Sequence, residues 1–328
     1  MVVSEPKRGE KMDVVSIGET MVSFTPNTNG QMRYAKQFSK RIAGAETNTL
    51  IGLAKLGHRT GWISSVGNDE FGSAILSAVR GEGVDTSQVH ISLSSPTGLL
   101  FKEYMNEDHI QVHYYRNHSA ASKLTPNDIN EKYISESKYL YITGITPALS
   151  ESCREAIFHS ITIAKRHNVK VIFDPNLRTK LWDEVTAKKT LLAIAEKSNI
   201  ILPGIQEGKF LFNESSPQKI AELFHDLGTE KVVIKLGEKG AYYSTGSESE
   251  YVPAFRIKKV VDPVGAGDGF AAGFISGLLD QLPMSEAVAR ACVIGAVVTT
   301  VSGDIEGLLD RKGLENFTQS FLSDDVLR

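Results

Sequence analysis

The sequence predicts an α/β protein in which a mainly parallel sheet carries helices on both faces and a smaller group of strands forms a separate lid. Short apolar runs alternate along most of the chain with amphipathic stretches of about 10–15 residues, which is the pattern of parallel strands joined by helices. Two segments, about 22–41 and 91–116, break this alternation. No Pro-rich linker or fixed-period repeat divides the chain, so we expect a single domain over 13–328 behind a disordered tail over 1–12.

The first half of the chain supplies two strand–helix pairs. The apolar run 14–17 is short enough for a buried strand. A helix is expected from Thr47, because apolar residues recur there at helical spacing until Gly57 ends it. The same reasoning predicts a second strand over 60–66 and a second helix over 71–79.

The second half repeats the pattern more regularly. Its apolar runs predict four more strands, at 139–142, 169–173, 199–202 and 232–236. The amphipathic stretches between them predict helices at 151–167, 185–195 and 217–227.

The two interrupting segments are rich in strands and lack a helix. The second reads as a hairpin, with strands over 98–104 and 110–116 around a polar turn at 106–108. Consecutive strands without a helix between them pair antiparallel, so we expect a small accessory sheet. In an enzyme such a sheet is a candidate lid, and a hairpin without function is the alternative.

Composition limits the classes of ligand and site. Hydrophobic residues make up 41% of the 328 residues and charged residues 23%, which is ordinary for a protein with a sizeable core. A net charge of −3 gives no reason to expect nucleic acid as a partner. Cys153 and Cys292 lack the paired spacing of structural zinc. Without an apolar leader or a run of about 18 apolar residues, we expect a cytoplasmic protein with no membrane partner.

The segment 262–268, Asp-Pro-Val-Gly-Ala-Gly-Asp, follows a strand-like run and opens a helix with one apolar face. Glycines at a helix start let the backbone approach a ligand, and the unpaired N–H groups there accept anionic oxygens. Asp268 lies beside that anion site, where a carboxylate can take the proton of an attacking hydroxyl. The alternative is a Gly-rich turn in which Asp268 only complements the helix dipole.

The residues over 261–274 resemble the C-terminal signature of the ribokinase-type (PfkB) sugar kinases. Those over 44–57 resemble the N-terminal signature of that family, and 66–72 also match. The resemblance extends from about Val14 to Leu308 and implies a ribokinase-like fold that uses ATP and Mg²⁺.

The resemblance also assigns roles. Asp268 would be the catalytic base, and the anion hole would be Gly265, Ala266 and Gly267. The nucleotide would lie against those three residues, Gly265, Ala266 and Gly267, and against Lys235, Gly237 and Gly240. Glu207 would position Mg²⁺ through water, although Gly204 stands where the family usually has Asn. In some relatives Asp262 helps to hold a monovalent cation, and the resemblance leaves that open here.

Two arginines bear on the substrate. Tyr114 and Arg116 share one face of the second lid strand, and Arg178 follows a strand at the edge where open α/β sheets bind ligands. Each arginine alone would be read as a solvated surface residue, but two at site positions favour an anionic substrate. A hydrogen bond to a charged group contributes about 1.5–3 kcal/mol, enough to separate a sugar acid from a neutral sugar.

Within the family, 114–116, 119–122 and 174–178 are similar to the members that phosphorylate 2-keto-3-deoxygluconate, although Leu100 stands where some of them have tyrosine. That similarity implies a dimer paired through the lid. The residues it implies as sugar contacts are Gly44, Asn48, Tyr114, Arg116, Ile145, Arg178 and Asp304.

Two alternatives stay open. A kinase for a neutral ketose such as fructose is disfavoured, because no Asp closely follows the pair Gly18-Glu19, where fructokinase-like members often carry one. A non-catalytic sugar or nucleotide sensor is disfavoured by the intact Gly-Ala-Gly-Asp element and by the lack of an appended DNA-binding segment.

Overall fold

The structure is a computed structural model that describes residues 11–106 and 109–326. The predicted tail over 1–12 therefore lies outside the described residues, except for Lys11 and Met12, and Met12 packs against the core. Of the predicted turn over 106–108, only Asn106 is described. Among the described residues, no helix has the length and apolar character that crossing a membrane requires.

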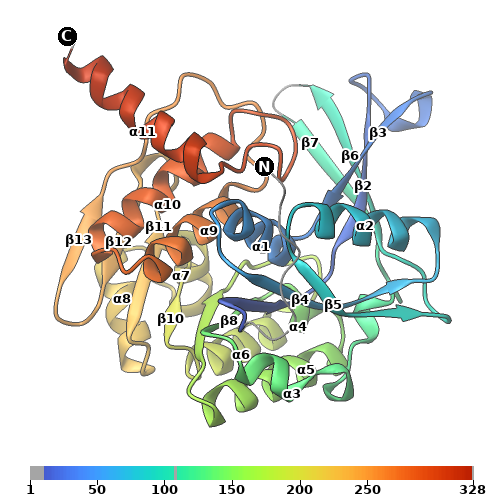
Figure 1. The fold of residues 1–328 in the computed structure, drawn as a ribbon, viewed down its shortest axis with the longest axis horizontal. Helices are drawn as coiled ribbons and strands as arrows, with labels where there is room; N and C mark the ends of the chain where they lie inside the picture. The colour runs from blue at the N-terminus through green and yellow to red at the C-terminus, as the bar shows by residue number, and fades with distance from the viewer. Residues whose placement is uncertain (1–10, 107–108, 327–328) are drawn as a thin grey trace.

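A nine-stranded sheet runs through the middle of the molecule (Figure 1). Its strands pair in parallel except for the last two at one edge, which are antiparallel. From that edge the order is β13 (Ser249–Val252), β12 (Ala241–Ser244), β11 (Lys231–Lys235), β10 (Ile200–Ile201), β9 (Lys170–Asp174), β8 (Tyr139–Thr143), β1 (Val14–Ile17), β4 (Thr60–Gly67) and β5 (Asp85–Ser92). The six predicted strands are all present, and β5, β12 and β13 are additional.

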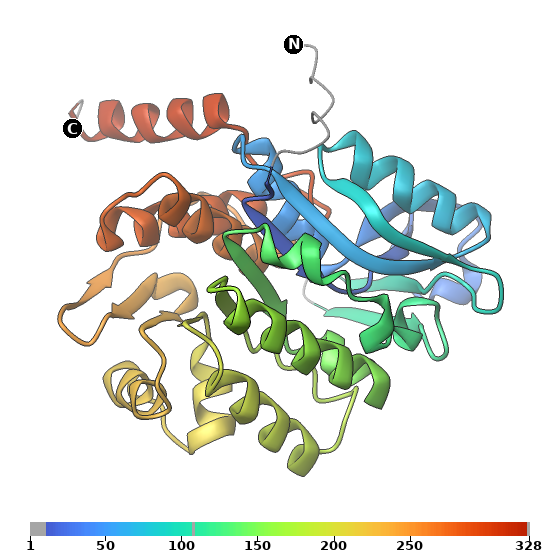
Figure 2. The same ribbon diagram turned by 60° about the horizontal axis from the view of Figure 1, so that its bottom comes forward.

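Helices cover both faces of this sheet (Figure 2). Successive strand residues point to opposite faces, so Val14 belongs to one core cluster and Val15 to the other. The first face carries α1 (Ala45–Lys55), α2 (Glu70–Gly81), α9 (Ala266–Leu279) and α10 (Met284–Val298). The second carries α3 (Glu131–Ser135), α4 (Thr146–Leu149), α5 (Glu151–Arg166), α6 (Glu184–Ala195), α7 (Ile205–Phe212) and α8 (Pro217–Asp226). α11 (Arg311–Val326) extends away from the body of the molecule.

Short polar side chains start several of these helices where the sequence places them. Asp69, Ser150, Asp183 and Ser216 each accept a hydrogen bond from a backbone N–H of the first turn. Such caps contribute about 1 kcal/mol each, because they satisfy N–H groups that the helix leaves unpaired. Single 3₁₀ turns occur at Met32–Tyr34, Ala121–Lys123, Pro126–Asp128 and Gly237–Lys239.

A separate four-stranded sheet forms the lid, which stands beside α2 in Figure 1. Its order is β3 (Phe38–Ala43), β2 (Met21–Pro26), β6 (Leu99–Asn106) and β7 (His109–Tyr115). The predicted hairpin is confirmed, because β6 and β7 pair antiparallel. β2 and β6 pair in parallel, unlike the antiparallel sheet expected, because the chain crosses the main sheet between them. The predicted start of the lid at 91 was also wrong, since β5 carries residues up to Ser92 in the main sheet.

Candidate active site

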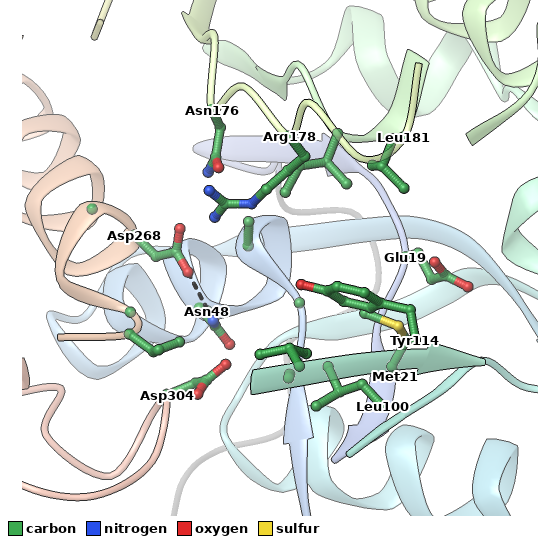
Figure 3. Close-up of a pocket in the computed structure, with 18 of the residues that line it drawn as sticks. Glu19, Met21, Asn48, Leu100, Tyr114, Asn176, Arg178, Leu181, Asp268 and Asp304 are labelled. Carbon is green, nitrogen blue, oxygen red and sulfur yellow. Dashed lines mark hydrogen bonds between the residues drawn. The ribbon is translucent and has the colours of Figure 1, made fainter. Parts of the chain in front are cut away.

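A cavity of about 980 Å³ lies between the lid and the carboxyl ends of the main-sheet strands. Open α/β sheets bind ligands at this edge. Figure 3 shows side chains from three directions converging on it: the start of α9, the loop after β9 and the lid. The predicted site residues that line it are Gly44, Asn48, Tyr114, Arg116, Ile145, Arg178, Glu207, Lys235, Gly265, Gly267, Asp268 and Asp304. Among the described residues, the lining does not include the predicted Ala266, Gly237 or Gly240.

The start of α9 provides the anion site. Gly265 is the N-cap and has φ +85°, a left-handed conformation in which glycine is favoured. A Cβ there would also lie only 2.9 Å from the backbone oxygen of Asp304. The first helical turn leaves N–H groups unpaired and facing the cavity. Ala266 contributes less than expected, because its N–H bonds back to the Pro263 carbonyl at 3.4 Å.

Asp268 lies in that first turn and is 8% exposed. The Asn48 side-chain amide donates to its Oδ2 at 2.8 Å (Figure 3). The pKa of Asp268 is raised to about 7, mainly by burial and also by the nearby Asp304 and Asp174 carboxylates, while Asn48 and Arg178 oppose the shift. A carboxyl group with this pKa can accept a proton near neutral pH.

Lys235 brings a positive charge to the same place. It ends β11, and its Nζ lies 2.7 Å from Oδ2 of Asp174, which is fully buried at the end of β9. Burial raises the pKa of Asp174, and the Lys235 ammonium opposes that shift. A Cβ placed on Gly267 would lie 4.0 Å from Lys235 Nζ, so the ammonium stands at the start of α9. The geometry suits a polyanionic ligand.

Glu207 is committed to the backbone on both oxygens. Its Oε2 accepts the Gly204 N–H at 2.7 Å and its Oε1 accepts the Leu177 N–H at 3.3 Å. It thus caps α7 and holds the loop that carries Arg178. Each oxygen retains a lone pair, and Mg²⁺ usually keeps several waters, so the residue fits a water-mediated ion. Within the described ranges, no group of three or more acidic, histidine or cysteine side chains forms a dedicated metal site.

The sugar side of the cavity combines polar groups from the body with a lid above. In Figure 3 the Arg178 side chain extends from the loop after β9 toward Asp268. Asn48 is buried, and its Oδ1 has no hydrogen-bond partner among the described residues. Such an oxygen needs a donor, and a sugar hydroxyl could supply one. Leu100 and Tyr114 of the lid close the other side.

Arg116 has a protein partner that sequence analysis missed. Its Nε lies 2.7 Å from Glu19 Oε2, and one terminal nitrogen lies 2.5 Å from the same oxygen. Ser119 donates to the other Glu19 oxygen. The Arg116 guanidinium also stands 5.6 Å from the centre of the Tyr114 ring. Because this buried ion pair satisfies much of Arg116, the exposed Arg178 is the better placed of the two for an anionic substrate.

The comparison with known proteins agrees with the geometry of the site. Residues 11–311 match the model of the pfkB family carbohydrate kinases. The chain is 43% identical to the 2-dehydro-3-deoxygluconokinase of Bacillus subtilis, over 94% of this chain and 95% of that protein. It is 33% identical to the enzyme of the same name from Thermoproteus tenax, over 90% and 91%. It is also 33% identical to the 5-dehydro-2-deoxygluconokinase of Geobacillus thermodenitrificans, over 94% and 93%.

Solved structures confirm the predicted fold class. The PfkB protein from Polaromonas sp. JS666 superposes with a TM-score of 0.85 at 38% identity, covering 93% of this chain and 99% of that one. A putative ribokinase II from E. coli in complex with ATP and Mg²⁺ superposes with a TM-score of 0.87 at 26% identity, covering 94% and 99%.

Proposed function

Because this chain belongs to the pfkB family of carbohydrate kinases, we propose that it transfers the γ-phosphate of ATP to the primary hydroxyl of 2-keto-3-deoxygluconate (2-dehydro-3-deoxygluconate). The product would be the 6-phosphate. Asp268 carries the proposal, since a buried carboxyl group whose pKa is near 7 stands at a helix start that can bind phosphate.

The reaction balances around Asp268. Its carboxylate takes the proton of the primary hydroxyl as that oxygen attacks the γ-phosphorus, and the bond from phosphorus to the bridging oxygen breaks to release ADP. Negative charge on the transferring phosphoryl group faces the first-turn amides of α9 and the Lys235 ammonium. Lys235 is held in place by its contact with Asp174.

Nucleotide and metal follow from the family. PfkB kinases use ATP with Mg²⁺, and the ion supplies charge neutralisation between the phosphates when it is bound. In this chain Glu207 would hold it through water, and Lys235 with Gly265 and Gly267 would line the phosphate path. The short turn Gly237–Lys239 and Gly240 would border the nucleotide from outside the cavity lining.

The two arginines of the site favour a negatively charged sugar. Arg178 would take the substrate carboxylate at the rim, while Arg116, oriented by Glu19, would contribute a second positive group beneath Tyr114. Asn48 would bind a hydroxyl through its unpartnered Oδ1. Two of the similar proteins are, by name, kinases of deoxy keto-gluconates, which supports an anionic substrate.

We extend the proposal to the assembly and the ions. The outer face of the lid carries a cluster of aromatic side chains, Phe24, Phe38, Phe101 and Tyr115, which supports a dimer paired through the lid. A monovalent cation at Asp262 would compete with contacts already present, since Tyr104 donates to Asp262 at 3.2 Å and Lys102 lies 3.9 Å away.

The test is a coupled ADP-release assay with one substrate at a time. The panel holds 2-keto-3-deoxygluconate, its C4 epimer, 5-keto-2-deoxygluconate and fructose, and the Asp268→Asn variant serves as the blank. We expect the highest kcat/KM on 2-keto-3-deoxygluconate, and a clear preference for fructose would refute the role of the arginines.

The second candidate is phosphorylation of 5-keto-2-deoxygluconate, favoured by the likeness to relatives with that activity in their name. A preference for that acid would keep the kinase mechanism and change only the sugar. Binding of sugar and ATP with no ADP released over hours would instead support a non-catalytic sensor.

A further inference from the structure

Lys102 is a buried lysine on lid strand β6 that no role in the proposed reaction uses. Its Nζ lies 2.5 Å from Oδ1 of Asp304 and 3.9 Å from Oδ2 of Asp262. All three side chains are less than a tenth exposed. A buried ammonium requires a carboxylate partner, and loss of one partner leaves the other charge uncompensated. The contact therefore ties this lid strand to the body of the protein.

The inward face of β6 reaches the body of the protein at several points. Leu100, Lys102 and Tyr104 alternate along the strand, so all three point to the same side. Leu100 lines the cavity, and the Tyr104 hydroxyl donates to Asp262 Oδ2 at 3.2 Å. Asp262 begins the segment that ends at Asp268. One strand of the lid thus contacts both the sugar side and the start of the catalytic segment.

Asp304 continues this connection toward α9. Its carboxylate lines the cavity, and its backbone oxygen packs so closely on Gly265 that a Cβ there would lie 2.9 Å away. A shift of the Asp304 backbone toward α9 would therefore press on the first glycine of the anion site. Its negative charge also raises the pKa of Asp268.

We propose that Lys102 is a positioning residue that fixes Asp304 in the sugar site and couples the position of the lid to the start of α9. The inference rests on the proposed function, because Asp304, which lines the cavity, is a sugar contact only if the chain binds the sugar as the family resemblance implies. The ammonium also compensates the Asp304 carboxylate, which would otherwise face an anionic sugar together with Asp268. Like charges gathered in a cleft disfavour an anionic ligand.

The first experiment compares Lys102→Met with Lys102→Arg and with Lys40→Met, which removes an exposed lysine from lid strand β3. We expect Lys102→Met to raise KM for 2-keto-3-deoxygluconate by about tenfold or more while KM for ATP changes less than about threefold. Lys102→Arg should keep KM for the keto acid close to the wild-type value, and Lys40→Met should leave both KM values unchanged. Equal losses for both substrates would overturn the proposal.

A double-mutant cycle tests whether Lys102 acts through Asp304. If it does, Lys102→Met combined with Asp304→Asn has about the same kcat/KM as Asp304→Asn alone, because the second change removes a contact that is already lost. Multiplying losses would mean that Lys102 acts independently, and would refute the proposal.

The same cycle read by thermal unfolding needs no turnover. We expect the unfolding temperatures of the four proteins to be non-additive, with the double variant more stable than the two single losses predict. Additive losses would refute the contact itself. If the unfolding temperatures of the four proteins show this coupling but the wild-type protein releases no ADP with the keto acid, the proposed function fails. The contact between the lid and Asp304 would still stand. Where Lys102→Met alone fails to fold, Lys102→Arg and the double variant still report the coupling.

Discussion

Asp268 is active only as a carboxylate, and burial together with Asp304 and Asp174 raises its pKa to about 7. We therefore expect kcat to fall about tenfold per pH unit below that pKa and to level off above it. Asp304→Asn removes a neighbouring negative charge and should shift this acidic limb to lower pH, whereas Asp226→Asn, an exposed change on α8, should not. Initial rates across the pH range check both, and an acidic limb near pH 4 in the wild-type enzyme would mean that the surroundings do not raise the pKa of the base. Asp268→Asn should lower turnover by roughly 10²–10⁴ with substrate binding largely kept.

The two arginines of the site should respond differently to removal. Arg178→Ala takes an exposed group from the cavity rim, so we expect KM for the keto acid to rise about 10- to 100-fold with little loss of stability. Arg116→Ala leaves the buried Glu19 carboxylate without its partner, so the unfolding temperature should fall as well. Steady-state kinetics and thermal unfolding of both variants measure this. Lys180→Ala, which removes another positive charge from the rim, is the control. An equal rise in KM for this variant would mean that binding depends only on the overall positive charge of the rim.

The sequence predicts site residues that share one local motif, but it does not show which distant residues contact each other. Asp268 and the glycines before it occupy one short segment whose pattern carries its own meaning. Glu19 and Arg116 are 97 residues apart, and Lys102 and Asp304 are 202 apart, so neither pair is visible without the fold. Alternation along β6 places Lys102 on the same face as Leu100, which gives a weak signal.

At the scale of elements, Asp280 joins three helices. It caps the C-terminus of α9 and accepts hydrogen bonds from Arg290 of α10 at 2.6 Å and from Arg311 of α11 at 2.8 Å. These contacts hold its pKa well below the usual range, with the Arg311 hydrogen bonds the largest cause. We expect Asp280→Asn to lower the free energy of unfolding at pH 7 by about 1–2 kcal/mol, a figure reduced for partial solvent screening.

The sign with pH follows from the lowered pKa. Asp280 contributes fully above the usual aspartate range, and the contribution is lost as pH falls through the lowered value, so the difference between wild type and variant should shrink below about pH 4. Urea unfolding at pH 7, 4 and 3 measures this difference. A constant difference, or the same loss in Asp226→Asn, would contradict the ion-pair explanation.

Strands could be predicted where they are apolar and of ordinary length. All predicted strands of the main sheet lie in buried runs, such as β1 and β9. β13 was missed because its first three residues are exposed, as an edge strand allows. β10 was predicted with four residues but has two. β2 and β6 pair in parallel, with elements of the main sheet between them in the chain. No local sequence pattern predicts that pairing.

On the scale of the whole molecule, the lid leaves an aromatic surface turned away from the cavity. Phe24 stacks on Phe101 with ring centres 5.3 Å apart, and the ring of Tyr115 meets Phe101 at 5.5 Å. Phe71 of α2 packs against the inner end of this cluster at 5.8 Å. Tyr115 remains 61% exposed at the outer end, so the cluster is incompletely covered in one chain.

A dimer that pairs these surfaces would bury the exposed aromatic rings and exclude water from them. We therefore expect the wild-type protein to sediment as a dimer at micromolar concentration and Tyr115→Lys to sediment as a monomer, because a charge would be desolvated at the centre of the interface. Val185→Lys places the same charge on an exposed residue of α6, outside the aromatic cluster, and should leave the dimer intact. Sedimentation velocity distinguishes these species directly. A monomeric wild type, or a Tyr115→Lys variant that stays dimeric, would exclude the lid as the interface.

If the dimer also holds the lid in place, the monomeric variant should show a raised KM for the keto acid, because Lys102 and Tyr104 reach the site from the same lid sheet.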